Sequence, residues 1–255
     1  MGIFKVLKNS LKLLRNRPKI FLPKILENLV FSFLWLYLAN LLVNPLETTF
    51  SEVWPLLVVW ALLTPVHIWI FNSYIMMVQL WDKNDFCMKK AFKQGFFKIP
   101  HSLGSMIITI SLAIGVSLPG FFFFQQGIAK DSLAFIYLGT GWLLATLFSV
   151  FVISYLAPTS VIIGEKNFKQ NLKDGFKASN QLKGIIAVLT VITFSLLIVT
   201  IMLEGVFRSI GIAGYFVFRI IYAIINVYVL IINPSLLLSA KKADLDGVNL
   251  NLNDL

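Results

Sequence analysis

The sequence predicts an all-α integral membrane protein, a polytopic bundle of six transmembrane helices with three amphipathic helices at the cytoplasmic surface. Two observations lead to this fold class. Only 13% of the 255 residues are charged, whereas a soluble domain has about 25%. The mean hydropathy is +0.82, and six apolar runs each reach the roughly 20 residues that a membrane-spanning helix needs. A soluble core with so little polar surface to cover it is excluded.

The six apolar runs are the expected spans, and they must be helical because backbone polar groups in lipid have to be paired within their own segment. They cover Ile25–Val43, Val53–Trp81, Leu103–Gln125, Leu133–Ile163, Leu182–Glu204 and Ile210–Ser239. Three short connections are expected on the external side, namely Asn44–Glu52, Gln126–Ser132 and Gly205–Ser209. None of these connections is long enough to hold a soluble domain.

Positive charge is distributed unevenly between the two sides of this arrangement. Of the 22 lysines and arginines, 19 lie before the first span, in the connections after the second and fourth spans, or in the C-terminal tail. By the positive-inside rule, both termini are cytoplasmic in a multi-pass protein of the cell membrane. The net charge of +10 is thus a topology signal, and it favours anionic lipid over nucleic acid as a partner.

A basic amphipathic segment precedes each expected helical hairpin. The tetrapeptides are KNSL at 8–11, KQGF at 93–96 and KDGF at 173–176, at offsets of 85 and 80 residues. They predict a threefold repeat of surface helix plus hairpin, with units of about 1–81, 82–163 and 164–239, followed by a loose polar tail at 240–255. The alternative, that cytoplasmic connections are basic in any membrane protein, stays open.

Each of these segments places apolar residues at spacings of three and four, which is the helical period. A helix with one apolar face and basic flanks lies in the headgroup plane, where lysines extend toward lipid phosphate. The candidate headgroup contacts are Lys8, Lys12, Lys93, Lys169, Lys173 and Lys177.

Two ionisable residues within the expected spans form the candidate intramembrane polar site, because burying such groups is costly. Arg219 would contact an anionic substrate or a lipid phosphate. The favoured interpretation is a structural pair, with Glu204, Glu52 or Asn40 as its partner, or a side chain that extends outward. His67 would serve a proton relay, but we expect a core histidine bonded to a backbone or hydroxyl group.

Other polar features of the spans have simpler explanations. Glu27 follows Lys24 by three residues and is expected to form a local helical pair with it. Four prolines are expected to interrupt the helices of four spans, since proline lacks a backbone donor. They are Pro65, Pro119, Pro158 and Pro234.

The residue types that carry most enzyme chemistry do not form a recognisable set. No Gly-rich phosphate loop is followed by Lys-Ser or Lys-Thr. Two histidines do not supply a nucleophile, base and orienting group, and the single cysteine, Cys87, has no partner for a disulfide or a metal cluster. The sequence therefore predicts no enzyme, no cofactor and no metal.

The region around the fifth span resembles a known family. A proline near the end of a span, an acidic residue and a basic amphipathic helix with Ser-x-x-Leu are represented by Pro158, Glu165, Ser179 and Leu182. This pattern is similar to that of uncharacterised multi-span proteins of bacteria and archaea, which are related to the membrane domain of some glycerophosphodiester phosphodiesterases. The spacing differs from the family pattern. The resemblance implies a six-span helical fold and transfers no catalytic residue.

The function expected from these features is a non-enzymatic membrane component: a scaffold, a lipid-organising protein or a subunit of a membrane assembly. Its expected partners are anionic lipids, with a protein partner or a second copy of the chain also in view. The alternative is a transporter or permease subunit for a small or anionic substrate. A membrane-embedded lipid enzyme is a third class, which the scattered polar groups disfavour.

Overall fold

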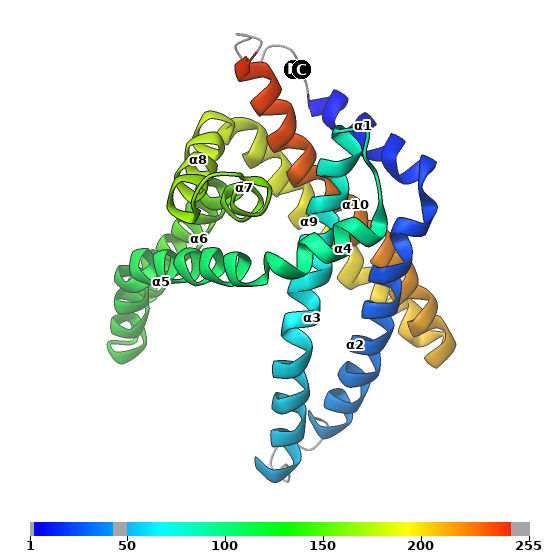
Figure 1. The fold of residues 1–255 in the computed structure, drawn as a ribbon. Coiled ribbons are helices and arrows are strands. Elements are labelled where there is room, and N and C mark those ends of the chain that lie inside the picture. Colours follow the sequence, from blue (N-terminus) through cyan, green and yellow to red (C-terminus); the bar gives the residue numbers. More distant parts are fainter. Residues whose placement is uncertain (1–2, 43–49, 246–255) are drawn as a thin grey trace. The chain divides into compact units, whose positions relative to one another are not determined.

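The computed structural model describes residues 3–42 and 50–245, and within them the regular structure is entirely helical. The chain divides into two compact units, one formed by residues 1–99 and 191–255 and the other by residues 100–190. Figure 1 labels the helices in chain order. They are α1 (Ile3–Asn16), the short 3-10 helix η1 (Pro18–Ile20), α2 (Phe21–Leu42), α3 (Phe50–Asp82), α4 (Met88–Phe97), α5 (Ile99–Ala129), α6 (Leu133–Ser154), α7 (Ala157–Ile163), α8 (Phe168–Gln181), α9 (Lys183–Ser209) and α10 (Ile212–Leu245).

Five segments of the described chain are long and apolar enough to cross a membrane. They are Leu57–Asp82, Ile99–Ala129, Leu133–Ile163, Lys183–Ser209 and Ile212–Lys242. These segments coincide with the second to sixth expected spans, and they make the protein a multi-pass helical membrane bundle. The first expected span forms α2 but is not among the five.

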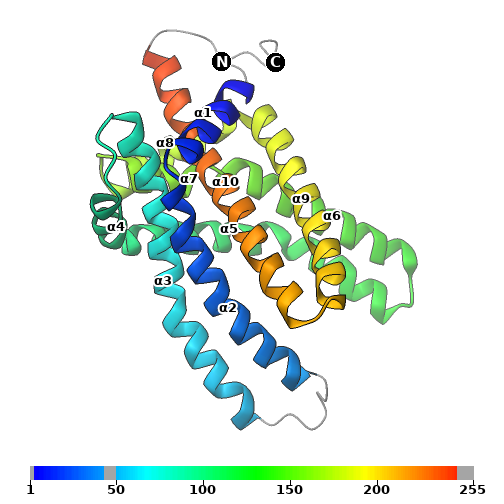
Figure 2. The ribbon, with the colours of Figure 1, turned by 90° about the vertical axis from the view of Figure 1, so that its right-hand side faces the viewer.

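In the first unit, α2 and α3 form an antiparallel hairpin with α10 beside α2, as Figures 1 and 2 show. The buried core of this unit includes Ile20, Tyr74 and Ile231, which are each 0% exposed. The Tyr74 hydroxyl donates a hydrogen bond of 2.6 Å to the Ile20 carbonyl. This bond satisfies a buried polar group and fixes the start of α2 against α3.

The short helix α4 lies directly on α3. A Cβ built on Gly95 would be 2.6 Å from the Ser73 Oγ and 2.8 Å from the Ser73 backbone nitrogen. The Asn72 amide donates to the Gly95 carbonyl at 3.2 Å, and the Trp69 indole N–H donates to the Phe92 carbonyl at 2.7 Å. Glycine at position 95 is thus required by the close approach of the two helices.

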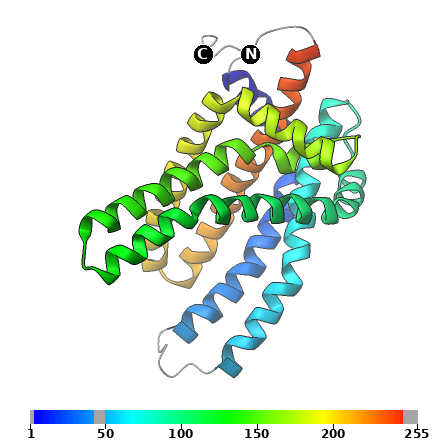
Figure 3. The same cartoon turned by 90° about the vertical axis from the view of Figure 1, so that its left-hand side faces the viewer.

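In the second unit, α5 and α6 form a second antiparallel hairpin, seen most clearly in Figure 3. The fourth expected span is divided here into α6 and α7, with Tyr155 and Leu156 between them. Pro158 lies in the first turn of α7, where a missing N–H costs nothing. The backbone N–H of Leu156 donates instead to the Ser179 Oγ of α8 at 2.9 Å.

The helix α8 begins at a side-chain cap and lies on α7. The Asn167 Oδ1 accepts from the backbone N–H of Gln170 at 2.9 Å, which satisfies one of the free donors at a helix N-terminus. A Cβ on Gly175 would be 2.6 Å from the Ala157 Cα and 2.8 Å from the Ser160 Cβ. The helical character expected for this basic segment is confirmed.

Several expected boundaries differ from the structure. Pro65, Pro119 and Pro234 lie inside helices that continue past them, so the expected interruption occurs only at Pro158. The helix α3 already begins at Phe50, inside the expected connection Asn44–Glu52, whose residues 44–49 lie outside the described part. The helix α10 continues to Leu245, so residues 240–245 of the expected loose tail are helical. The remainder of that tail is not among the described residues.

Candidate functional site

The hairpin of α2 and α3 brings His67 to the side chain of Glu27. Both residues lie twenty positions from residue 47, near the middle of the connection between the two helices. Antiparallel helices rise equally per residue, so residues equally far from the connection lie side by side. Ile20 and Tyr74, which are hydrogen-bonded to each other, obey the same register.

The Glu27 carboxylate is buried, with its side chain 3% exposed. Its Oε2 accepts from the Lys24 Nζ at 2.8 Å, and its Oε1 contacts the His67 Nδ1. An isolated buried carboxylate is strongly unfavourable, whereas a paired and hydrogen-bonded one is tolerated. Each oxygen of Glu27 therefore has its own partner, one from the same helix and one from α3.

His67 is the accessible member of this group, with its side chain 48% exposed. A carboxylate oxygen can only accept, so the Nδ1 of His67 carries a proton and the Nε2 is left for other partners. The ring lies edge-on to Phe31, with 6.2 Å between the ring centroids. The imidazole is thus oriented from two sides, by a charge and by an aromatic ring.

A cavity of about 400 Å³ adjoins this group, and we call it the His67 cavity. Three helices of the first unit supply its walls. The lining residues are Lys24, Glu27, Asn28 and Phe31 from α2, Trp60, His67 and Phe71 from α3, and Tyr222, Asn226 and Leu230 from α10. Its size falls within the range of small-molecule sites, about 300–1,000 Å³.

Several hydrogen-bond donors are among the polar groups of this cavity. The Asn28 Nδ2 is buried and has no hydrogen-bond partner. Lys24 has three N–H donors, of which one is directed at Glu27. The Glu27 charge is already balanced by Lys24. Such a site suits a ligand that accepts hydrogen bonds, and the surrounding aromatic rings suit an apolar chain.

Arg219 does not reach the His67 cavity. Its guanidinium forms an ion pair with the Glu204 carboxylate at 3.1 Å, which Arg208 also contacts at 2.8 Å. The Arg219 guanidinium lies 4.8 Å from the ring centroid of Tyr215 and 6.0 Å from that of Tyr222. Glu204 is one of the three partners expected for Arg219, whereas the side chains of Glu52 and Asn40 lie outside the described part. The structure therefore separates Arg219 from His67, with Tyr222 between them.

The expectation for His67 itself is wrong. We expected a core histidine bonded to a backbone or hydroxyl group, but its ring is half-exposed and contacts a carboxylate. The local pair of Lys24 and Glu27 is confirmed, yet sequence reasoning missed its contact with α3. The register of the hairpin was the available signal. Nothing in the sequence indicated the contribution of Tyr222 and Asn226 from α10.

The six expected headgroup lysines all lie on α1, α4 or α8, and each is exposed. No group of three or more histidine, cysteine, aspartate or glutamate side chains converges in the described part of the chain. Neither a protein-family model, nor a curated protein, nor a solved structure matches this chain.

Proposed function

We propose that this chain is a non-enzymatic, six-span protein of the cell membrane, with cytoplasmic termini, that holds an anionic amphiphile in the His67 cavity. The observation that carries the proposal is the donor-rich cavity beside a charge-balanced, buried Lys24–Glu27 pair. This role makes the protein a lipid-organising component rather than a catalyst. The relation to phosphodiesterase membrane domains stays a prediction.

The helix α2 is the sixth span in this proposal. It has 22 residues and would therefore extend about 33 Å at 1.5 Å per residue, enough to cross the hydrocarbon core. It forms a hairpin with the membrane-length helix α3 and lies beside α10. An even number of spans is also what the distribution of positive charge requires if both termini share one side.

Three parallel contacts support the proposed repeat. Gly95 of KQGF lies on α3, and Gly175 of KDGF lies on α7, each without room for a Cβ. The corresponding residue of KNSL is Ser10, which is 1% exposed and whose Oγ is 3.2 Å from the Ser235 Oγ of α10. In each copy a small residue at the same position thus seats a basic helix on the apolar helix of another hairpin.

Charge balance favours an anionic ligand over a cationic one. A cation would meet the amine of Lys24 and a carboxylate whose two oxygens are already engaged. An anion would meet the amide of Asn28 and the ring of His67, and histidine is a residue type that can carry a positive charge. Besides Lys24 and Glu27, the titratable group facing this space is Tyr222 of α10.

A transporter or permease subunit is the second candidate. The specific observation in its favour is that a cavity with polar lining residues lies beside His67, between the apolar helices α2, α3 and α10. In that case the anionic ligand would be released on the other side of the membrane instead of being retained.

Binding to the purified full-length protein tests the first proposal. Dodecanoate, dodecanol and dodecyltrimethylammonium share a chain and differ in charge, and their affinities can be compared by native mass spectrometry below micelle-forming concentrations. We expect dodecanoate to bind at least about tenfold more tightly than the other two, which corresponds to about 1.4 kcal/mol. The variant H67Q can still donate to Glu27 but cannot become positively charged, so it should lose this preference.

The matched control is H101Q, which changes the other histidine of the chain in α5 and should retain the preference. Equal binding of the three amphiphiles, or an unchanged preference in H67Q, would refute the proposed anion site. Movement of dodecanoate across the membranes of vesicles that contain the protein, faster than in protein-free vesicles and reduced to that baseline rate by H67Q, would favour the transporter over the lipid-organising role.

A further inference from the structure

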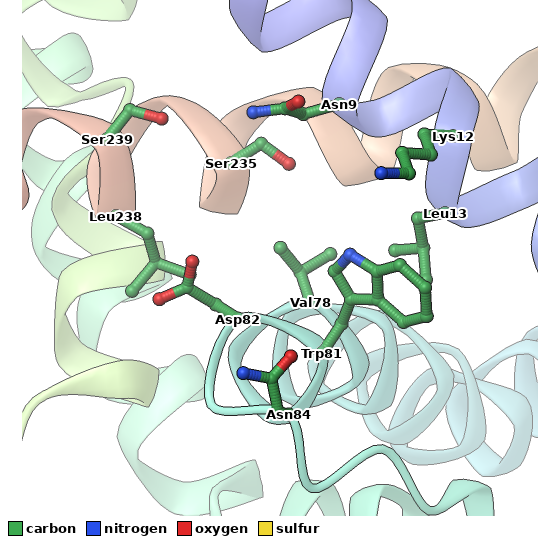
Figure 4. A pocket seen from close by; sticks show the side chains of 10 residues that line it. All are labelled: Asn9, Lys12, Leu13, Val78, Trp81, Asp82, Asn84, Ser235, Leu238 and Ser239. Atoms are coloured by element: carbon green, nitrogen blue, oxygen red, sulfur yellow. The ribbon is translucent and has the colours of Figure 1, made fainter.

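A second cavity lies in the first unit, at the end of α3. It has a volume of about 300 Å³ and is enclosed by α1, by the end of α3 with its following turn, and by the C-terminal part of α10. Figure 4 shows the side chains that line it. We call it the Trp81 cavity. Under the proposed topology it opens at the cytoplasmic surface.

Charged groups reach this cavity from opposite walls. The amine of Lys12 extends from α1 toward the open space, and the carboxylate of Asp82 extends from α3, as Figure 4 shows. The Asp82 Oδ1 accepts from the Lys242 Nζ at 2.6 Å. This bond holds the carboxylate in place and leaves its second oxygen as an acceptor for a ligand.

Neutral groups that both donate and accept hydrogen bonds supply the remaining polar lining. They are the amides of Asn9 and Asn84 and the hydroxyls of Ser235 and Ser239. Asn84 has a φ of +56°, in the left-handed region that asparagine tolerates better than most residues. This backbone conformation ends α3 and places the Asn84 amide at the edge of the cavity.

Trp81 supplies an apolar surface of this cavity, and its ring packs against Phe86. Its indole lies edge-on to Phe86, with 6.1 Å between ring centroids. The guanidinium of Arg17 lies 5.3 Å from the ring centroid of Phe86. A positioned indole presents a flat apolar face together with an N–H donor.

We propose that the Trp81 cavity binds a ring polyol that carries a phosphate. A ring polyol has hydroxyls that both donate and accept, which matches the amides, the serines and the free oxygen of Asp82, and its carbon skeleton covers the indole. Lys242 balances the carboxylate of Asp82, so the charge of Lys12 is left to balance the phosphate. A bare phosphate would leave the carboxylate of Asp82 facing an anion, and an ammonium headgroup would face Lys12. The same chemistry occurs in a lipid headgroup and in a soluble polyol phosphate.

Native mass spectrometry of the purified full-length protein tests this proposal with three probes. Phosphatidylinositol has both the ring polyol and the phosphate, phosphatidic acid has a phosphate alone, and inositol 1-phosphate is the soluble form. We expect phosphatidylinositol to bind at least about tenfold more tightly than phosphatidic acid. The variants W81L and K12Q should each lose that preference.

The matched control is K19Q, which removes an exposed lysine of η1 that does not line the cavity. It should bind like the unchanged protein. Competition by inositol 1-phosphate at the concentration of the lipid would identify a soluble ligand, and its failure to compete would identify the lipid. Either result supports the polyol phosphate site. Equal binding of the two lipids, or equal loss in K19Q and K12Q, would overturn it.

This inference does not depend on the His67 cavity, because no residue lines both cavities. The variant H67Q should therefore bind phosphatidylinositol normally. Loss of dodecanoate binding with retention of phosphatidylinositol binding, or the converse, shows which of the two proposals has failed.

Discussion

Replacing Gly175 with alanine tests how closely α8 lies on α7. The added Cβ would be 2.6 Å from the Ala157 Cα, whereas carbon atoms in contact are about 3.5–4.0 Å apart. The Ala157 Cα is part of the backbone and cannot rotate away. Overpacking of this kind costs about 1–3 kcal/mol. Alanine also has a higher helix propensity than glycine, by about 0.8–1.0 kcal/mol, so part of that cost is hidden.

A second glycine isolates the packing cost. Gly115 lies in α5 of the same unit, and a Cβ there meets nothing within 4 Å. The variant G115A gains helix propensity without a clash, so the difference between G175A and G115A measures packing alone. We expect G175A to be less stable than G115A by about 1–3 kcal/mol.

Unfolding in mixed detergent micelles, followed by circular dichroism, measures this difference. Hydrogen exchange of residues 168–181 would locate the loss in α8. Equal stability of G175A and G115A would show that α8 does not lie on α7 as described. Because Gly95 has the same relation to Ser73, the variant G95A should respond like G175A if the two segments are copies of one element.

Two further variants probe buried polar groups, with the same unfolding measurement. The variant E27Q leaves the amine of Lys24 buried without a counter-charge and should lower the free energy of unfolding by about 3 kcal/mol, whereas the double variant K24M/E27Q should recover most of that loss. The control D85N, in an exposed pair, should change the free energy of unfolding by less than about 1 kcal/mol. An equal loss in E27Q and D85N would contradict the burial of Glu27. The variant S179A leaves the backbone N–H of Leu156 without its acceptor and should cost about 1–3 kcal/mol, and an unchanged stability would mean that this bond is not formed.

Sequence periodicity was sufficient for the helices because membrane spans satisfy their own backbone groups. The apolar runs and the basic segment at 168–181 became helices as expected. The break between α6 and α7 was predictable from Pro158, whereas the breaks expected at the other three prolines do not occur. At the break the backbone N–H of Leu156 donates to the Ser179 Oγ, a group that lies further along the chain in α8 and could not be anticipated from the proline.

The candidate site was predictable only in part. His67 was identified because ionisable residues are rare within spans, but Glu27 was assigned to a local pair with Lys24 alone. Local spacing shows which residues share a helix face, whereas contacts between helices depend on register and packing. The walls from α10 could not be anticipated, since α10 is separated from α2 by more than half of the chain.

Pro234 lies on α10 between the two cavities. Because proline has no N–H, the carbonyl of Leu230 lacks its helical partner, and a helix bends most easily at such a point. Leu230 lines the His67 cavity, and Ser235 lines the Trp81 cavity. Ile231, between these two residues in the sequence, is 0% exposed.

Because Leu230 and Ser235 line different cavities, a bend of α10 at Pro234 would move one wall of each. Two ligands coupled in this way would change each other's affinity by the same factor. A headgroup bound at one end of α10 would in this way set how firmly an amphiphile is held further along the same helix.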